Sequence, residues 1–121
     1  MQKKKLLIVD DEPDILEFLS KRLERNGFRV FTATCGQECL DSAAGIDPDL
    51  IILDIVMPFM DGYEVIKKLR ASTHTKNVPI IMHSVRKESR AIFKSMELGG
   101  IDYVIKPVTF EALLKVIRRY V

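Results

Sequence analysis

Acidic, hydroxyl and basic side chains stand at the ends of several apolar segments of this chain. Asp10 and Asp11 follow the first segment, and Asp54 follows the third. Ser84 and Lys106 stand at the ends of the fourth and the fifth. Carboxylates that gather in one place repel one another unless a counter-charge is present. A hard divalent cation such as Mg²⁺ and a lysine ammonium can supply that charge, and a hydroxyl can donate to a phosphate oxygen. If the fold brings these groups together, they predict a site for phosphoryl transfer.

Asp54 is the predicted nucleophile of that site. It stands alone after the most apolar segment, Leu50–Leu53, whereas Asp10 and Asp11 form a pair that is better placed to hold a metal ion. An aspartate can form an acyl phosphate as a covalent intermediate. A metal would then neutralise both the attacking carboxylate and the incoming phosphoryl oxygens.

The elements that must position these residues alternate between two periodicities. Short apolar runs predict strands at residues 5–9, 28–32, 49–53, 79–83 and 101–105. Apolar residues at helical spacing predict helices at residues 13–26, 36–44, 62–70, 86–98 and 110–121. Strands that are apolar throughout must be covered on both faces, which predicts an α/β fold with a doubly wound parallel sheet. In such sheets ligands bind beyond the carboxyl ends of the strands, where the acidic, hydroxyl and lysine residues lie.

Composition favours one globular domain over residues 1–121. Hydrophobic residues make up 47% of the 121 residues and charged residues 30%, which excludes a disordered chain. Apolar runs are too short to cross a membrane, and the expected location is the cytoplasm. The net charge of +2 gives no case for direct nucleic-acid binding. Residues 1–62 carry 7 basic and 12 acidic groups, and residues 63–121 carry 12 basic and 5 acidic. This asymmetry predicts an acidic pocket and a separate basic face.

Five segments, taken in their order and spacing, resemble the receiver domain of two-component response regulators. The matching segments are Leu6–Glu12, Asp49–Asp54, Met57–Gly62, Ser84 and Asp102–Pro107. The chemical residues are separated by 43 residues from Asp11 to Asp54, by 30 on to Ser84 and by 22 on to Lys106. Each segment is a weak signal alone, but the resemblance covers essentially the whole chain. It implies a flavodoxin-like sheet of five strands in the order 2-1-3-4-5, flanked by five helices.

The resemblance implies a phospho-accepting switch. Asp54 would take a phosphoryl group from a sensor histidine kinase or a phosphotransfer protein, in a reaction that needs Mg²⁺. Asp11 would bind the metal directly, Asp10 mainly through water, and the backbone carbonyl of Val56 would complete the protein's ligands beside Asp54. The chain would catalyse only its own phosphorylation and dephosphorylation, so it is expected to be a signalling switch rather than an enzyme.

Three further roles follow from the same resemblance. Lys106 would bridge to the carboxylates and then to the phosphoryl group, while Ser84 would swing toward that group. Tyr103 resembles the switch aromatic that follows Ser84 inward and changes the surface of the fourth helix, fifth strand and fifth helix. A downstream protein or output domain, which the sequence does not identify, would read that surface. The bond between Lys106 and Pro107 resembles the family's cis peptide.

The chain departs from the family pattern at positions around the expected site. Val85 replaces a residue that is usually very small, and its branched side chain could crowd a phosphoryl group. Val56 is apolar and cannot orient the attacking water, so we expect a phosphoryl group that lasts longer than in fast-cycling members. Arg86 could pair with the phosphoryl group or with a nearby acid. Val108 stands where the family often has an aromatic residue.

The histidines and cysteines are expected to be structural. His83 precedes Ser84 on a strand, so it should point away from the site and form a hydrogen bond beneath a helix. A pH switch at His83 is the alternative. His74 lies in a polar loop and should be solvated. Cys35 and Cys39 should be half-buried side chains rather than metal ligands.

Rival functions differ in what they need at two positions. An aspartate-nucleophile phosphatase needs a second aspartate two residues after the first, where this chain has Val56. A nucleotide- or flavin-binding domain needs a glycine-rich turn after the first strand, where this chain has acidic residues. A pseudo-receiver, an interaction module that is not phosphorylated, remains the alternative, and Val85 is its best support. The chain could be a complete single-domain regulator or a receiver from a longer protein.

Overall fold

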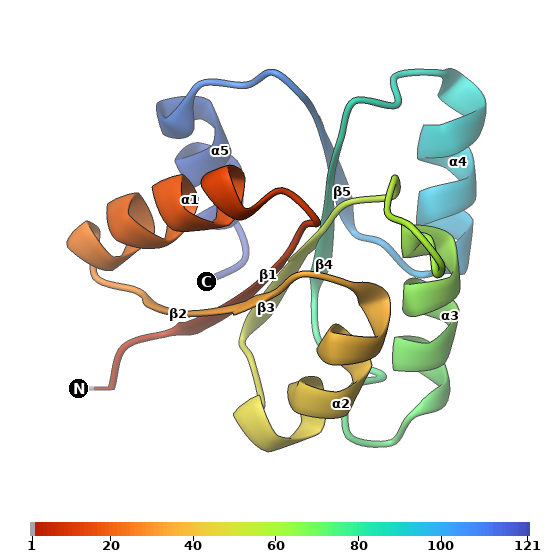
Figure 1. The fold of residues 1–121 in the computed structure, drawn as a ribbon, viewed down its shortest axis with the longest axis horizontal. Helices are drawn as coiled ribbons and strands as arrows, with labels where there is room; N and C mark the ends of the chain where they lie inside the picture. Colours follow the sequence, from red (N-terminus) through yellow and green to blue (C-terminus); the bar gives the residue numbers. More distant parts are fainter. Residues whose placement is uncertain (1) are drawn as a thin grey trace.

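Five parallel strands form a central sheet that is covered by helices on both sides (Figure 1). This computed structural model describes residues 2–121, and Met1, the first residue of the expected domain, lies outside the described residues. The elements follow one another as β1 (Lys5–Val9), α1 (Pro13–Arg25), β2 (Arg29–Ala33), α2 (Gly36–Ile46), β3 (Leu50–Leu53), α3 (Gly62–Ala71), β4 (Ile80–Ser84), α4 (Ser89–Leu98), β5 (Asp102–Ile105) and α5 (Phe110–Ile117).

The strand order β2-β1-β3-β4-β5 confirms the expected flavodoxin-like topology. The chain leaves β1 for β2 on one side, then returns past β1 to β3 and continues outward to β5. The switch in direction lies between β1 and β3, where ligands bind in sheets of this kind. The register pairs Val9 with Leu53, so the residues that follow β1 and β3 emerge side by side.

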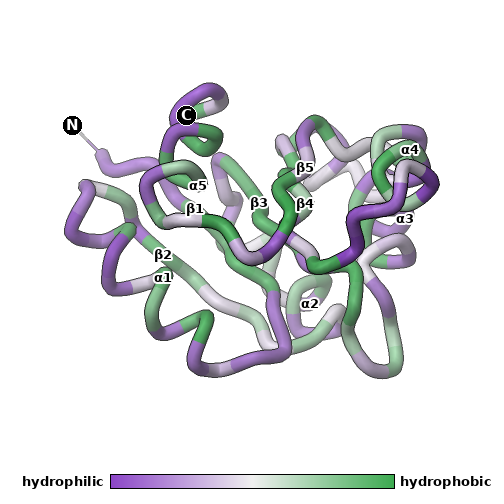
Figure 2. The backbone as a smooth tube through the Cα atoms, turned by 90° about the horizontal axis from the view of Figure 1, so that it is seen from above, coloured by the Kyte–Doolittle hydropathy of each residue, from purple (hydrophilic) through white to green (hydrophobic). Residues whose placement is uncertain are grey.

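Two cores hold the helices against the sheet. Helices α1 and α5 cover one face, and α2, α3 and α4 cover the other (Figure 1). Strand residues alternate between the two cores: along β3, Leu50 and Ile52 face α1 and α5, whereas Ile51 and Leu53 face the other helices. Figure 2 shows the hydrophobic colour along β3 and β4, in the middle of the sheet. Burial on both faces explains why these strands are apolar throughout.

The predicted elements are confirmed, and the largest differences lie at two helix ends. Strand boundaries agree within one residue. Helix α4 begins at Ser89 rather than at residue 86, because the first residue of this segment that reaches the core is Ala91. Helix α5 ends at Ile117 rather than at residue 121, and residues 118–120 form a turn. Nothing in the described part of the chain forms a helix long and apolar enough to cross a membrane.

Candidate functional site

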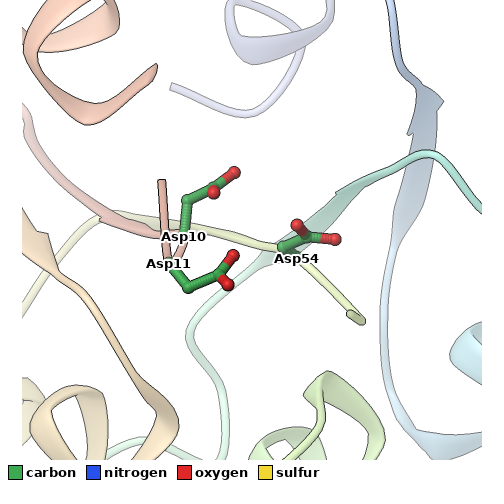
Figure 3. Close-up of side chains that lie close together, drawn as sticks. All are labelled: Asp10, Asp11 and Asp54. Carbon is green, nitrogen blue, oxygen red and sulfur yellow. The ribbon is translucent and has the colours of Figure 1, made fainter. Parts of the chain in front are cut away.

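Three carboxylates meet at the carboxyl end of the sheet, as expected. Asp10 and Asp11 follow β1, and Asp54 follows β3 (Figure 3). Each offers an oxygen, and these oxygens lie within 4.8 Å of one another. Asp10 and Asp54 are buried, whereas Asp11 is exposed. The cluster therefore consists of two buried carboxylates and one that faces solvent.

Lys106 supplies the positive charge of this pocket. Its Nζ donates to Oδ2 of Asp10 at 2.6 Å and to Oδ2 of Asp54 at 3.1 Å. Burial on its own lowers the pKa of Lys106, but the hydrogen bond to Asp10 and the charges of both carboxylates raise it above its ordinary value overall. The lysine therefore stays charged and neutralises part of the acidic cluster.

The remaining oxygen of each buried aspartate accepts a backbone hydrogen bond. The N–H of Glu12 donates to Oδ1 of Asp10 at 3.0 Å, and the N–H of Val56 donates to Oδ1 of Asp54 at 3.2 Å. The backbone of each aspartate is also tied to the neighbouring strand, since Asp54 N–H donates to the carbonyl of Val9 at 3.1 Å and Asp10 N–H donates to that of Ala33 at 3.1 Å. Main chain and side chain are both fixed before any ligand binds.

Gly62 holds the Asp54 backbone from behind. The N–H of Gly62 donates to the carbonyl of Ile55 at 2.8 Å. A Cβ at this position would lie 2.4 Å from the carbonyl oxygen of Asp54 and 2.7 Å from the Cα of Ile55. The side chain of Asp61 accepts from Glu64 N–H at 3.0 Å and so begins α3 at this point. The sequence showed the motif that contains Gly62 but not this positioning role, because the close approach joins residues eight apart.

Ser84 and Tyr103 lie on the other half of the site. Ser84 ends β4 and is fully buried, and its Oγ accepts from the N–H of Arg86 at 3.3 Å. Tyr103 lies on β5, is half-buried, and its hydroxyl donates to the carbonyl oxygen of Arg86. Burial raises the pKa of the Tyr103 hydroxyl, so it remains a hydrogen-bond donor at neutral pH. Both side chains therefore contact the loop that joins β4 to α4.

The side chains of Val56, Val85 and Arg86 are exposed to solvent. Val85 is 59% exposed and Val56 is 47% exposed. Arg86 forms an ion pair with Glu88 at 2.7 Å. The two expected partners of Arg86 were a phosphoryl group and a nearby acid, and Glu88 is such an acid. The peptide bond between Lys106 and Pro107 is cis, as the resemblance implied.

His83 points away from the acidic pocket but is not hydrogen-bonded as expected. It faces the core of α1 and α5, and it is only 6% exposed. Burial, together with the charge of Lys106, lowers its pKa to about 4. Among residues 2–121, no group forms a hydrogen bond with the imidazole. The expectation of a bonded histidine was wrong because the wall opposite its ring is almost entirely apolar.

His74 and Cys35 lie as predicted, whereas Cys39 is fully buried rather than half-buried. His74 is exposed in the loop between α3 and β4. Cys35 is half-buried and Cys39 is buried. Burial raises the pKa of the Cys39 thiol to about 12, so it is not a thiolate at neutral pH.

Comparison with known proteins identifies the family. A family model described as the response regulator receiver domain matches residues 6–118. The chain belongs to this family. PhoP of Bacillus subtilis, an alkaline phosphatase synthesis transcriptional regulatory protein, is 43% identical over 104 residues, which are 86% of this chain and 42% of PhoP. Chemotaxis protein CheY4 of Vibrio cholerae has a similar structure, with a TM-score of 0.94 and 33% identity, covering 98% of this chain and 99% of CheY4.

This receiver domain spans less than half the length of the curated relatives that it matches. A probable cyclic di-GMP phosphodiesterase of Vibrio cholerae is 40% identical over 108 residues, which are 89% of this chain but only 24% of that protein. The similarity therefore concerns the signalling domain that these proteins share. It does not extend to the rest of each relative. The names of these proteins describe the whole protein, including the parts that this chain does not match.

Proposed function

We propose that Asp54 accepts a phosphoryl group from the phosphohistidine of a sensor histidine kinase or a phosphotransfer protein. The observation that carries this proposal is the bridge from Lys106 to Asp10 and Asp54, at 2.6 and 3.1 Å, inside a cluster of three carboxylates. The ammonium group of Lys106 can turn from Asp54 to a phosphoryl oxygen while it stays within the cluster. Family membership supports the same function.

In the proposed step, a carboxylate oxygen of Asp54 attacks the phosphorus atom. The P–N bond to the donor imidazole breaks, and its electron pair stays on the imidazole nitrogen. The product is a mixed anhydride, an aspartyl phosphate. The N–H of Val56, bonded to Oδ1 of Asp54, holds the carboxylate in one orientation during the attack. No protein acid is needed, because the donor ring carries a proton on its second nitrogen and departs as neutral imidazole.

The donor set fits a hard divalent cation, and Mg²⁺ is the one we propose. Three carboxylates face a single ammonium, which leaves an excess of negative charge among oxygen ligands. Asp10, Asp11 and Asp54 would hold the ion together with the carbonyl of Val56. When bound, it would neutralise charge on the phosphoryl oxygens. Asp11 is the exposed member of the cluster and so meets an incoming ion first.

Ser84 and Tyr103 would carry the change to the surface formed by α4, β5 and α5. Both contact the β4–α4 loop through Arg86. A hydrogen bond from the Ser84 hydroxyl to a phosphoryl oxygen would draw that loop toward Asp54, and Tyr103 would repack behind it. Phosphorylation would then shift the balance between two arrangements of the loop.

This receiver domain is thus proposed to be a switch rather than an enzyme that acts on a separate substrate. Its downstream partner would be a protein or an output domain that reads the α4–β5–α5 surface. A cytoplasmic location is part of the same proposal. Contact with DNA or with a membrane is not part of the proposed role of this domain.

The test is to incubate the protein with Mg²⁺ and acetyl phosphate and to measure its intact mass. We expect the mass to rise by one phosphoryl group. This gain should not occur when Mg²⁺ is chelated before acetyl phosphate is added. Asp54→Asn should show no gain. Asp41→Asn, which changes an exposed aspartate of α2, should be phosphorylated like the parent protein.

A phosphorylated histidine kinase is the second donor in this experiment. Folded protein that gains no mass from either donor would contradict the proposal and favour the pseudo-receiver. A gain that persists in Asp54→Asn would place the acceptor elsewhere.

A further inference from the structure

A cavity of about 220 Å³ opens between α1 and α5. It shares Lys106 with the acidic site, but none of the three aspartates lines it. Its lining is almost entirely apolar and aromatic. The residues are Ile15, Phe18, Leu19, His83, Lys106, Pro107, Val108, Phe110 and Leu113. The proposed phosphorylation uses only Lys106 of this set.

His83 gives this cavity one hydrogen-bonding group without a protein partner. The side chain is more than nine-tenths buried and forms part of the cavity wall. Within the described part of the chain, residues 2–121, neither imidazole nitrogen has a hydrogen-bond partner. Because His83 lines the cavity, its ring nitrogens are free to pair with a molecule that enters it. A neutral imidazole offers one N–H donor and one acceptor nitrogen for that purpose.

The aromatic walls of the cavity are held in place from outside. The guanidinium of Arg22 lies 5.1 Å from the centre of the Phe18 ring and 5.3 Å from that of Phe110. One cation thus stacks on an aromatic ring from each helix and braces α1 against α5. Phe18 is 51% exposed, so one wall of the cavity also borders its opening. The cavity is therefore formed before a ligand arrives.

We propose that this cavity binds a small uncharged molecule of one or two rings that carries one hydrogen-bonding group. An apolar cavity of about 150 Å³ takes up benzene, so the volume here suits one or two rings. Phe18 and Phe110 provide aromatic surface for stacking, and His83 provides the single polar contact. A charged ligand is excluded, because Lys106 is the only charged residue of the lining and it is already bonded to Asp10 and Asp54.

Indole and indene are a matched pair of molecules for the test. They share one shape, but only indole has an N–H that His83 can accept. In a titration followed by amide NMR signals, we expect saturable shifts at residues 15–19, 83 and 106–113 with both molecules. Indole should bind about three- to tenfold more tightly than indene, which is the effect of one buried hydrogen bond.

Two variants test the two parts of the proposal separately. His83→Leu keeps an apolar wall of similar volume and should abolish the preference for indole. Val108→Phe should fill the cavity and abolish binding of both molecules. His74→Leu, which changes the exposed histidine of the α3–β4 loop, should leave both affinities unchanged. No step of this test requires phosphorylation, so its outcome is independent of the proposed function.

Three results would overturn the proposal. The first is shifts that do not saturate or that scatter over the surface, which would mean a cavity filled only by water. The second is equal binding of indole and indene by the parent protein, which would remove His83 from recognition. The third is self-association of the chain that buries Phe18 and excludes indole, which would assign the cavity to a second copy.

Discussion

The acidic site has two halves that are held by different numbers of contacts. The firm half lies at the ends of β1 and β3, and the loose half is the loop of residues 85–88 after β4. At the ends of β1 and β3, Asp10 and Asp54 are buried, and their carboxylates contact both Lys106 and a backbone N–H. Beyond β4, residues 85–88 are exposed, and their main side-chain contact is the surface ion pair between Arg86 and Glu88. Exposed ion pairs of this kind contribute little stability.

This difference follows from what each half must do. Attack on phosphorus needs oxygen atoms in one fixed geometry. A segment that responds to phosphorylation needs two arrangements of similar free energy, which few buried contacts allow. The residues that would perform the chemistry lie on the firm half. Those that would report it, Ser84 and Tyr103, both contact the loop of the other half.

Gly62→Ala should disturb the firm half at Asp54. Of the proposed substitutions, it should lower the free energy of unfolding the most. The new Cβ would lie 2.4 Å from the Asp54 carbonyl oxygen, so the backbone of Asp54 or of α3 must move. We expect the free energy of unfolding to fall by about 3 kcal/mol, together with slower phosphorylation by acetyl phosphate. Urea denaturation and intact mass measure the two effects.

Gly45→Ala is the matched control for that substitution. Gly45 lies in α2, and a Cβ there meets no atom within 4 Å. Alanine should therefore stabilise the protein slightly, by about 0.5–1 kcal/mol, through helix propensity. Equal effects of the two substitutions would show that Asp54 is not held from behind by α3.

His83→Leu tests where the firm half ends along β4. Burial, with the charge of Lys106, lowers the pKa of His83 to about 4, so the unfolded chain takes up a proton at higher pH than the folded protein. Stability should therefore fall as pH falls from about 6.5 to about 4. Between pH 7 and pH 5 this contribution is about 2 kcal/mol.

The measurement is the difference between the pH profiles of parent and variant in urea denaturation. His83→Leu should lose about 2 kcal/mol of acid sensitivity, whereas His74→Leu should keep it. Asp10 is the nearby group that raises the pKa of His83. If the two profiles coincide between pH 5 and pH 7, the imidazole is solvated and β4 is open at this end.

Much of this contrast could be predicted from the sequence. Continuous apolar runs such as Leu50–Leu53 identify strands buried on both faces, and a parallel sheet then places Asp10 and Asp54 at one edge. The start of α4 was predicted three residues too early, because Arg86 and Lys87 are compatible with a helix but have no core contact to hold one. Local propensity cannot report that lack of contact.

Contacts that depend on how separate elements pack could not be predicted from the sequence. The approach of Gly62 to the Asp54 carbonyl depends on how α3 returns to the sheet. The lack of a hydrogen bond at His83 depends on which side chains of α1 and α5 lie opposite β4. Both facts are set by the packing of elements, so no motif or spacing could have predicted them.

Val56→Asn should sharpen the comparison through the lifetime of the phosphoryl group. Val56 is half-exposed beside Asp54 and has no group that can orient water. An amide there should position the attacking water and shorten the lifetime about tenfold, equivalent to one hydrogen bond of about 1.4 kcal/mol. Decay of the phosphorylated mass after removal of acetyl phosphate measures this rate.

Val85→Ala is the companion of that substitution on the loop half. Its side chain is 59% exposed, so we expect stability to change by less than about 0.5 kcal/mol. Phosphorylation should become faster if the branched side chain crowds the phosphoryl group. A parent lifetime of only seconds at neutral pH would contradict the effect assigned to both valines.

Phe59→Asn should have a small effect on stability and no direct effect on the chemistry, and it tests where the firm half ends after Asp54. Phe59 lies in the β3–α3 loop, close in sequence to Asp54, yet its side chain is fully exposed and its φ is 70°. A left-handed backbone costs a residue other than glycine about 1 kcal/mol, and asparagine tolerates it better. We therefore expect Phe59→Asn to raise the free energy of unfolding by up to about 1 kcal/mol, whereas Phe59→Ala, which keeps the backbone cost, should change it little. Equal values for the two variants would mean that the loop relaxes out of this conformation, and the firm half would then end at Asp54 itself.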